Sequence, residues 1–341
     1  MKQIALFILL SLCAGGLMCA QVTNRGGGAV EASAQGDIQR TFSVQPGGRL
    51  VMDVEPASIE VRTAGHSQIV VNVYRKVERA GDSRAEEILS QPKVNFEQQG
   101  NDLIIRAKFR GEDFRRWRRN GLQTRYIVSI PTVFNVDLKT SGGGVRVDDL
   151  RGEVRVKTSG GGLQFGKIDG PIFGNTSGGG ISLAGGNGKV EIKTSGGGID
   201  IGSGAGELSA ETSGGGIEIE DFVGDVFVRT SGGAIKANRI EGAIDASTSG
   251  GPIVASLRSQ PKKDSQLHTS GGGITVELEE SLALNIEAEA SGGHVVTELP
   301  VTVYGELRNH SLRGTLNGGG QTLVLQASGG SIQLRKLRRQ Q

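Results

Sequence analysis

Residues 194–201 read TSGGGIDI and residues 212–219 read TSGGGIEI, so one motif returns after 18 residues. The Thr-Ser-Gly-Gly sequence recurs at this interval from Thr140 to Thr248, and it reappears at Thr269. It continues as Ala-Ser-Gly-Gly at two later places. A fixed period indicates a repeat protein, in which each repeat forms one unit that stacks on its neighbours. The 18-residue period therefore indicates a stack of equivalent repeats.

Apolar and polar residues alternate within each repeat. The apolar positions of two repeats are Val145, Val147, Leu150, Val154 and Val156, and Ile217, Ile219, Phe222, Val226 and Val228. Alternation with a period of two, rich in β-branched residues, indicates strands, and each repeat has room for two. A repeat of 18 residues is too short to be built on helices. We therefore predict an all-β fold, a parallel β-solenoid with coils of about 18 residues that stack about 4.8 Å apart.

The Thr-Ser-Gly-Gly-Gly segments are predicted to form a corner between two strands. A sharp corner favours glycine because a positive φ costs glycine nothing, and because stacked corners come close enough to exclude a Cβ. The Thr and Ser hydroxyls are expected to form hydrogen bonds along the stack or with the corner amides. The serine is not expected to be a nucleophile, because the glycine that a nucleophile elbow places two residues earlier is missing at every Thr-Ser-Gly-Gly corner.

Residues 1–20 have the pattern of a secretory signal peptide, with a basic start, an apolar run and a cleavage point after Ala20. A membrane anchor is the alternative, but the run contains Gly15-Gly16 and is short for a span. Both cysteines, Cys13 and Cys19, lie in this segment, so the mature chain has no thiol for a disulfide. Lipidation of Cys19 stays open. We expect an exported protein, located in the periplasm, on the cell surface or in the medium.

The chain after residue 20 divides into four segments. They are a flexible Gly-, Ala- and Ser-rich linker (21–37), a β-rich N-terminal cap (38–139), the repeat solenoid (140–334) and a basic tail (335–341). Within the cap, a hairpin is predicted around Gly100. A short helix is predicted to begin at Ser83 and to end before Pro92.

The composition limits the classes of function. Glycine supplies 56 of 341 residues, and 43 of these lie between residues 140 and 330, so the excess belongs to the repeats. The net charge of +2 does not indicate a nucleic-acid partner. The repeats lack the aspartates of calcium-binding β-rolls, and the histidines have no metal-ligand spacing: His66, His268, His294 and His310. His294 is expected to replace a buried isoleucine. We expect no catalytic residue, no cofactor and no metal.

One cluster of charge lies between residues 106 and 125, where eight basic residues surround three aromatic ones and two acids oppose them. Its centre consists of Arg115, Arg116, Trp117, Arg118 and Arg119. Cations combined with an aromatic ring in a loop can hold phosphates, anionic sugars or lipid headgroups. These five residues are therefore the candidate polyanion-binding residues. The alternative is a solvated loop whose aromatic residues pack on the cap.

Three features carry a resemblance to a known family: Ile130-Pro131 before the first corner, the repeated Thr-Ser-Gly-Gly-Gly-Ile corners, and the segment from Gly314 to Gly330. With these features the chain resembles, over residues 42–334, a bacterial family of adhesin-type domains of unknown function. The family is similar in style to the head domains of autotransporter adhesins. The resemblance implies an exported, right-handed β-solenoid, and it supplies no catalytic residues.

Together these observations predict an exported, non-catalytic β-solenoid of the cell envelope or surface that acts as an adhesin or as a scaffold. Two alternatives stay open, a glycan-binding or glycan-cleaving β-helix and an envelope-stress sensing module. A glycan-cleaving enzyme needs acids or bases clustered on one face of neighbouring coils, and the outward positions show no such cluster. The expected partner is an envelope or surface glycan or protein. Neither nucleic acid nor a membrane span in the mature chain is expected.

Overall fold

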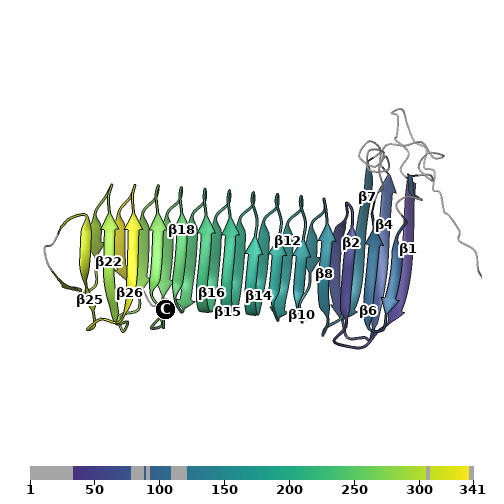
Figure 1. Cartoon of the computed structure of the whole chain (residues 1–341), viewed down its shortest axis with the longest axis horizontal. Coiled ribbons are helices and arrows are strands. Elements are labelled where there is room, and N and C mark those ends of the chain that lie inside the picture. Colours follow the sequence, from purple (N-terminus) through teal and green to yellow (C-terminus); the bar gives the residue numbers. More distant parts are fainter. Residues whose placement is uncertain (1–33, 78–87, 90–92, 109–120, 305–307, 338–341) are drawn as a thin grey trace, which may run out of the picture.

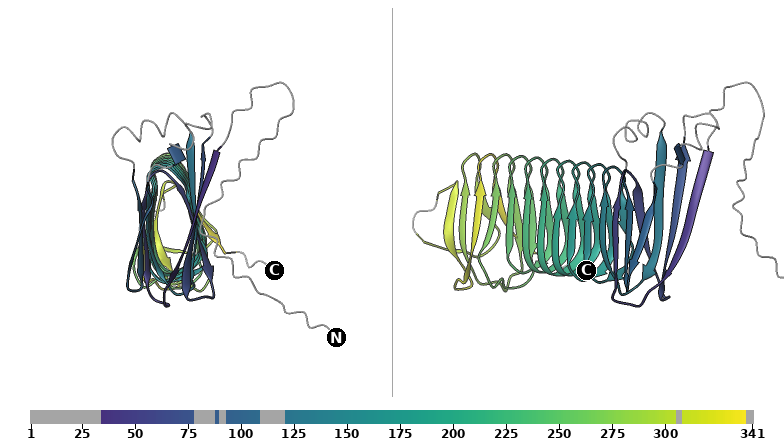
Figure 2. Two further views of the ribbon diagram at one scale, coloured as in Figure 1. Left: turned by 90° about the vertical axis from the view of Figure 1, so that its right-hand side faces the viewer. Right: turned by 45° about the vertical axis from the view of Figure 1, so that its right-hand side comes forward.

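The computed structural model describes residues 34–77, 88–89, 93–108, 121–304 and 308–337. These residues form an elongated stack of strands, and 27 strands join in one hydrogen-bonded sheet (Figure 1). Viewed along the long axis, the sheet winds around a narrow interior as a flattened ring (Figure 2). The predicted all-β class is confirmed.

Each repeat contributes strands to two faces, which meet at the Thr-Ser-Gly-Gly-Gly corner. The pre-corner face contains β8 (Asn135–Thr140), β11 (Val154–Lys157), β13 (Ile172–Asn175), β18 (Ile244–Thr248) and β20 (Ser265–Thr269). The post-corner face contains β9 (Val145–Val147), β12 (Leu163–Asp169), β17 (Ile235–Glu241), β19 (Ile253–Leu257) and β21 (Ile274–Leu278). Strands that run through both faces are β14 (Ile181–Lys193), β15 (Ile199–Thr212) and β16 (Ile217–Thr230), and the short β10 (Leu150–Arg151) lies in the turn opposite the corner.

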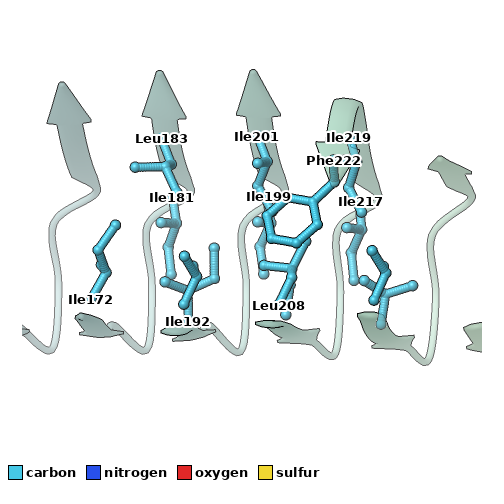
Figure 3. Close-up of a cluster of buried hydrophobic side chains, with 14 of the residues drawn as sticks. Ile172, Ile181, Leu183, Ile192, Ile199, Ile201, Leu208, Ile217, Ile219 and Phe222 are labelled. Atoms are coloured by element: carbon cyan, nitrogen blue, oxygen red, sulfur yellow. The ribbon is translucent and has the colours of Figure 1, made fainter. Parts of the chain in front are cut away.

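The repeats stack in parallel register at equivalent sequence positions. Val154 pairs with Ile172, Ile172 with Val190, and Val190 with Leu208. Each of these pairs joins residues 18 apart in sequence. Because the register keeps apolar residues on the inside in every coil, continuous columns of Ile, Leu and Val fill the interior (Figure 3).

Inward glycines compensate for the largest core side chains. A Cβ on Gly204 would lie 2.7 Å from the ring of Phe222, and a Cβ on Gly174 would lie 3.2 Å from the ring of Phe165. Both phenylalanines are buried. The core therefore reaches dense packing by placing a large side chain beside a glycine, which has no side chain, as close-packed interiors require.

The stack extends beyond the repeats into the N-terminal region. β2 (Arg49–Val54) lies between β8 and β6 (Asp102–Ala107), and β3 (Ser58–Ala64) lies between β9 and β7 (Leu122–Pro131), all in parallel. Two antiparallel strands, β4 (Gln68–Val77) and β1 (Ala34–Ser43), continue the post-corner face. β5 (Asn95–Gln99) pairs antiparallel with β6, which confirms the hairpin around Gly100. β1 begins within the segment expected to be a linker.

At the C-terminal end the spatial order of the coils departs from the sequence order. The strands there are β22 (Leu284–Ala290), β23 (Val295–Thr297), β24 (Thr302–Val303), β25 (Ser311–Leu316), β26 (Gln321–Ala327) and β27 (Ile332–Lys336). β26 inserts between β20 and β22, and β27 inserts between β21 and β23. The antiparallel strands β25 and β24 then follow β22 at the end of the stack.

A ladder of buried threonine hydroxyls joins the corners. Thr158 Oγ1 donates a hydrogen bond to the carbonyl oxygen of Gly143 at 2.8 Å, and Thr194 Oγ1 donates to that of Gly179 at 2.7 Å. The same bond is present at Thr176, Thr212, Thr230 and Thr248. The expected bonding of threonine along the stack is confirmed.

The reason for glycine at the corner differs in part from the expectation. Positive φ occurs in the opposite turn, as at Gly188 (120°), and not in the corner motif. At the corner, close approach decides, because a Cβ on Gly197 would overlap the backbone of Gly180. The third corner position is less crowded and holds Ala234 and His294 in two coils. His294 is therefore an exposed substitute for glycine, and the expectation of a buried isoleucine position is wrong.

Several predicted segments lie outside the described residues: the signal peptide, most of the linker, most of the helix between Ser83 and Pro92, and the end of the basic tail. Within the part of the chain that is described, no helix has the length and hydropathy needed to cross a membrane.

Candidate functional site

A groove crosses the post-corner face beside the corner. It has a volume of about 620 Å³, and its lining includes the third corner glycines Gly144, Gly162 and Gly180. Because glycine has no side chain, the surface is lowered where these residues stack. The corner sequence thus shapes the groove as well as the turn.

A row of polar side chains from five neighbouring coils lines the groove. The strand register places Glu60, Arg146, Gln164, Ser182 and Asp200 at equivalent positions in that order. At about 4.8 Å per coil, the row extends over roughly 19 Å. It offers a guanidinium, an amide, a hydroxyl and two carboxylates to a ligand that lies along the axis.

Glu60 is held by two arginines at one end of the row. Arg125 Nη2 lies 2.5 Å from Glu60 Oε2, and Arg62 Nη2 lies 2.6 Å from Oε1. The hydrogen bond from Arg125 lowers the pKa of Glu60 below its ordinary value of 4.5, and Arg62 adds to this effect, whereas burial opposes it. Glu60 is therefore an ionised hydrogen-bond acceptor at neutral pH.

A second hollow, of about 520 Å³, lies along the same row and shares Arg146, Gln164 and Ser182 with the first. Its two carboxylates also accept hydrogen bonds. Asp148 Oδ1 accepts a hydrogen bond from Arg146 Nε at 3.3 Å, and Asp149 Oδ1 accepts one from the backbone N–H of Lys167 at 2.7 Å. We call the two hollows together the polar groove.

The predicted polyanion-binding residues, Arg115, Arg116, Trp117, Arg118 and Arg119, lie outside the described residues. Two cations that precede them in the sequence are described. Arg106 Nη1 lies 3.2 Å from a carboxylate oxygen of Glu97, and Lys108 Nζ lies 2.8 Å from one of Asp53. Acids from neighbouring strands therefore balance these two charges, which a count along the sequence does not reveal.

Sequence analysis missed the polar groove, although four residues of the row follow one another at the repeat interval: Arg146, Gln164, Ser182 and Asp200. Aligning the outward positions of successive repeats would have found these four. Glu60 joins them only through the pairing of β3 with β9, which no repeat signals. Over the described ranges, no group of three or more His, Cys, Asp or Glu side chains is placed to hold a metal ion.

Comparison with solved structures finds bacterial proteins of low sequence identity. A putative adhesin from Parabacteroides merdae is 13% identical, covers 88% of this chain and 96% of its own, and has a TM-score of 0.34. A putative adhesin from Bacteroides fragilis is 12% identical, with coverages of 88% and 97% and a TM-score of 0.32. A putative lipid binding protein from Parabacteroides distasonis is 12% identical, with the same coverages and a TM-score of 0.33.

None of the curated proteins compared matches the sequence. The family model described as Toastrack DUF4097 matches residues 48–335, which is most of the chain. The protein therefore belongs to the Toastrack DUF4097 family.

Proposed function

We propose that the protein is exported to the cell envelope or surface and acts there as a non-catalytic binding protein, an adhesin or a scaffold. The polar groove carries this proposal, because five coils align hydrogen-bonding side chains along it. In this proposal the coils are right-handed and about 18 residues long, and β1 to β7 cap the stack. The signal-type pattern of residues 1–20 supports export.

The chemistry of the groove favours a glycan. Arg146, Gln164 and Ser182 present donors and acceptors at intervals of about 4.8 Å along the axis. Sugar hydroxyls both donate and accept hydrogen bonds, so an extended glycan meets several of these groups in succession. The acids and bases of the row partly cancel, which suits a ligand with little net charge.

The carboxylates of the groove support binding over cleavage. Glycoside hydrolysis needs a pair of carboxyl groups, one of them kept protonated by a raised pKa. The pKa of Glu60 is lowered instead, mainly by the hydrogen bond from Arg125. Asp148 and Asp149 are engaged by Arg146 and by a backbone amide. None of these three groups is set up as a general acid, and the fourth carboxylate of the groove, Asp200, is exposed and not enclosed in an apolar pocket.

Glycan arrays with the mature chain test the groove. Ser182→Arg places a long side chain in the groove and should abolish binding of any captured glycan. Thr275→Arg is the matched control, because Thr275 holds the same outward position on β21, outside the groove. Glycan binding that survives Ser182→Arg, or a new reducing end released from a bound glycan, would contradict the proposal. If the arrays capture no glycan and a pull-down from envelope fractions captures only proteins, the partner is a protein and not a glycan.

Export is tested separately. Mass spectrometry of the protein purified from fractionated cells should give a chain that starts at Gln21 and is found outside the cytoplasm. A full-length cytoplasmic chain would overturn the proposed location without affecting the groove.

A further inference from the structure

The pre-corner face carries a second concave surface, on the opposite face of the stack from the polar groove. This basic hollow has a volume of about 370 Å³. Two rows from four successive coils line it. One row is Lys139, Lys157, Asn175 and Lys193, and the other is Asp137, Arg155, Phe173 and Glu191.

Two neighbouring lysines of the hollow form no ion pair among the described residues, because the one acid opposite them, Asp53 on β2, is paired with Lys108. Lys139 and Lys157 lie on adjacent strands at paired positions, and both are exposed. Neither forms an ion pair with a described residue, whereas Lys193 lies 3.4 Å from Glu211. Like charges directly opposite on neighbouring strands repel. A bound anion would relieve this repulsion, so the two lysines favour binding of a negatively charged group.

An aromatic ring lies beside these cations. The guanidinium carbon of Arg155 lies 4.1 Å from the centre of the Phe173 ring. Phe173 is half-buried, and Arg155 also contacts Glu153, so both side chains are restrained. The hollow thus combines cations, an amide and an apolar surface in one place.

We propose that the basic hollow binds an acidic polysaccharide that lies along the solenoid axis. The carboxylates of its sugars face Lys139, Lys157 and Lys193, which extend over roughly 14 Å at about 4.8 Å per coil. The sugar hydroxyls face Asn175 and the two acids of the hollow, Asp137 and Glu191. Those acids repel every polyanion, but they repel a chain of low charge density less, and they accept hydrogen bonds from hydroxyls, which a polyphosphate lacks. The mixed lining therefore favours a uronate chain. The row of cations lies between Asp53, opposite Lys139, and Glu211, opposite Lys193, which limits the site to four coils.

Isothermal titration of the mature chain with oligogalacturonate tests this site. We expect binding that weakens steeply with added salt, because exposed charges are screened over about 8–10 Å at physiological ionic strength. Lys139→Ser with Lys157→Ser should reduce the affinity by about tenfold or more. The matched control is Lys167→Ser with Lys262→Ser, which removes the same charge from exposed positions elsewhere and should leave the affinity unchanged.

The aromatic contact has its own control. Phe173→Ser should weaken oligogalacturonate binding, whereas Phe227→Ser should not. Phe227 occupies the same outward column and has Arg229 at 4.4 Å from its ring, but it lies outside the hollow. Melting curves of both variants show whether they remain folded.

Three results would overturn the proposal. The first is no binding of oligogalacturonate at low salt by the folded parent chain. The second is equal loss of affinity in the two lysine double variants, which would indicate attraction by overall charge. The third is equal or tighter binding of inorganic polyphosphate or of a neutral galactan oligosaccharide, since either would remove the need for a ligand with both carboxylates and hydroxyls.

Discussion

Ile274 pairs in parallel register with Ile332, although the next corner in the sequence after that of Ile274 leads to Val295. Val295, on β23, pairs instead with Ile332 from the other side of β27. The coil that comes last in the sequence is therefore inserted between the two that precede it. This arrangement makes the C-terminal segment the link between the end of the stack and the rest of it.

Removing residues 321–341 tests this link. Without β26 and β27, β22 and β23 lose the parallel pairs through which they join the stack. We expect residues 284–316 to lose hydrogen-exchange protection while the coils before β20 keep theirs, because stability in a stack depends on adjacent coils. Removing residues 338–341 alone is the control and should change nothing. Retained protection over 284–316 would contradict the inserted order.

Gly197→Val tests the close approach at the corner. A Cβ at Gly197 would overlap the backbone of Gly180, and backbone cannot move aside as a flexible side chain does. We expect a loss of roughly 3 kcal/mol in the free energy of unfolding. Gly198→Ala is the matched control, since its Cβ would lie 3.3 Å from the carbonyl oxygen of Gly216 and Ala234 already occupies the equivalent place. Thermal melts of Gly197→Val that give a free energy of unfolding within about 0.5 kcal/mol of the parent value would contradict this role of the corner.

The repeat interval in the sequence was sufficient to predict which residues pair within the regular part of the stack. Val154, Ile172 and Val190 pair as their spacing predicts, because a strand displaced by one residue would turn its apolar side chains outward. The order of the last coils could not be predicted in this way. Ile332 and Val295 both follow an Ala-Ser-Gly-Gly corner, so either would fit beside Ile274.

The candidate sites were harder to predict, because they depend on which outward side chains become neighbours. The basic hollow combines Lys139 and Lys157 from successive repeats, and alignment of the repeats would have shown this pair. The neutralisation of Lys108 by Asp53 depends on the pairing of β2 with β6, for which the sequence has no repeat signal.

Deleting residues 194–211 removes one complete interval and tests the coil length. The new neighbours are compatible, because Phe222 would then lie beside Gly186, which leaves room as Gly204 does. Lys193 would lie beside Arg229 in place of Glu211, at a cost of about 1 kcal/mol or less. We expect a shorter folded stack with the same circular dichroism signature. Deleting residues 194–202 instead should disrupt strand pairing, and equal damage from both deletions would mean that 18 residues are not one coil.

Glu60 should make the protein less stable in acid. Its folded-state pKa is lowered, mainly by the hydrogen bond from Arg125, so the ionised form stabilises the fold above the ordinary value of 4.5. That contribution is lost as the pH falls through the lowered pKa, because the unfolded chain takes up the proton first. Glu60→Gln should therefore reduce the loss of stability between neutral pH and about pH 3, measured by urea unfolding. Glu287→Gln, at an exposed position without an ion pair among the described residues, is the control. An unchanged acid profile in Glu60→Gln would contradict the role of the two arginines.

The five residues that the sequence predicts to bind a polyanion, Arg115 to Arg119, are proposed as a further contact, and they are tested independently of the basic hollow. The variant replaces four arginines by serine: Arg115, Arg116, Arg118 and Arg119. We expect weaker binding of heparin or lipopolysaccharide with a shallower salt dependence. The sequence predicts that these charges are solvated, and solvated charges add little stability, so the melting temperature should stay nearly unchanged. The control replaces four exposed cations of the described residues by serine and so keeps the net charge equal to that of the first variant: Lys167, Lys262, Arg258 and Arg313.

Trp117→Ala separates a binding role from a packing role for the same segment. If Trp117 packs on the N-terminal strands, its removal should cost about 3–5 kcal/mol in unfolding free energy. If it contacts the ligand, polyanion binding should fall while the melting temperature holds, because the ring then contributes to the complex and not to the fold. Polyanion binding that is unchanged in both Trp117→Ala and the four-arginine variant would show that these residues are not a contact. The basic hollow with Lys139 and Lys157 would then be the remaining basic site that could explain the binding.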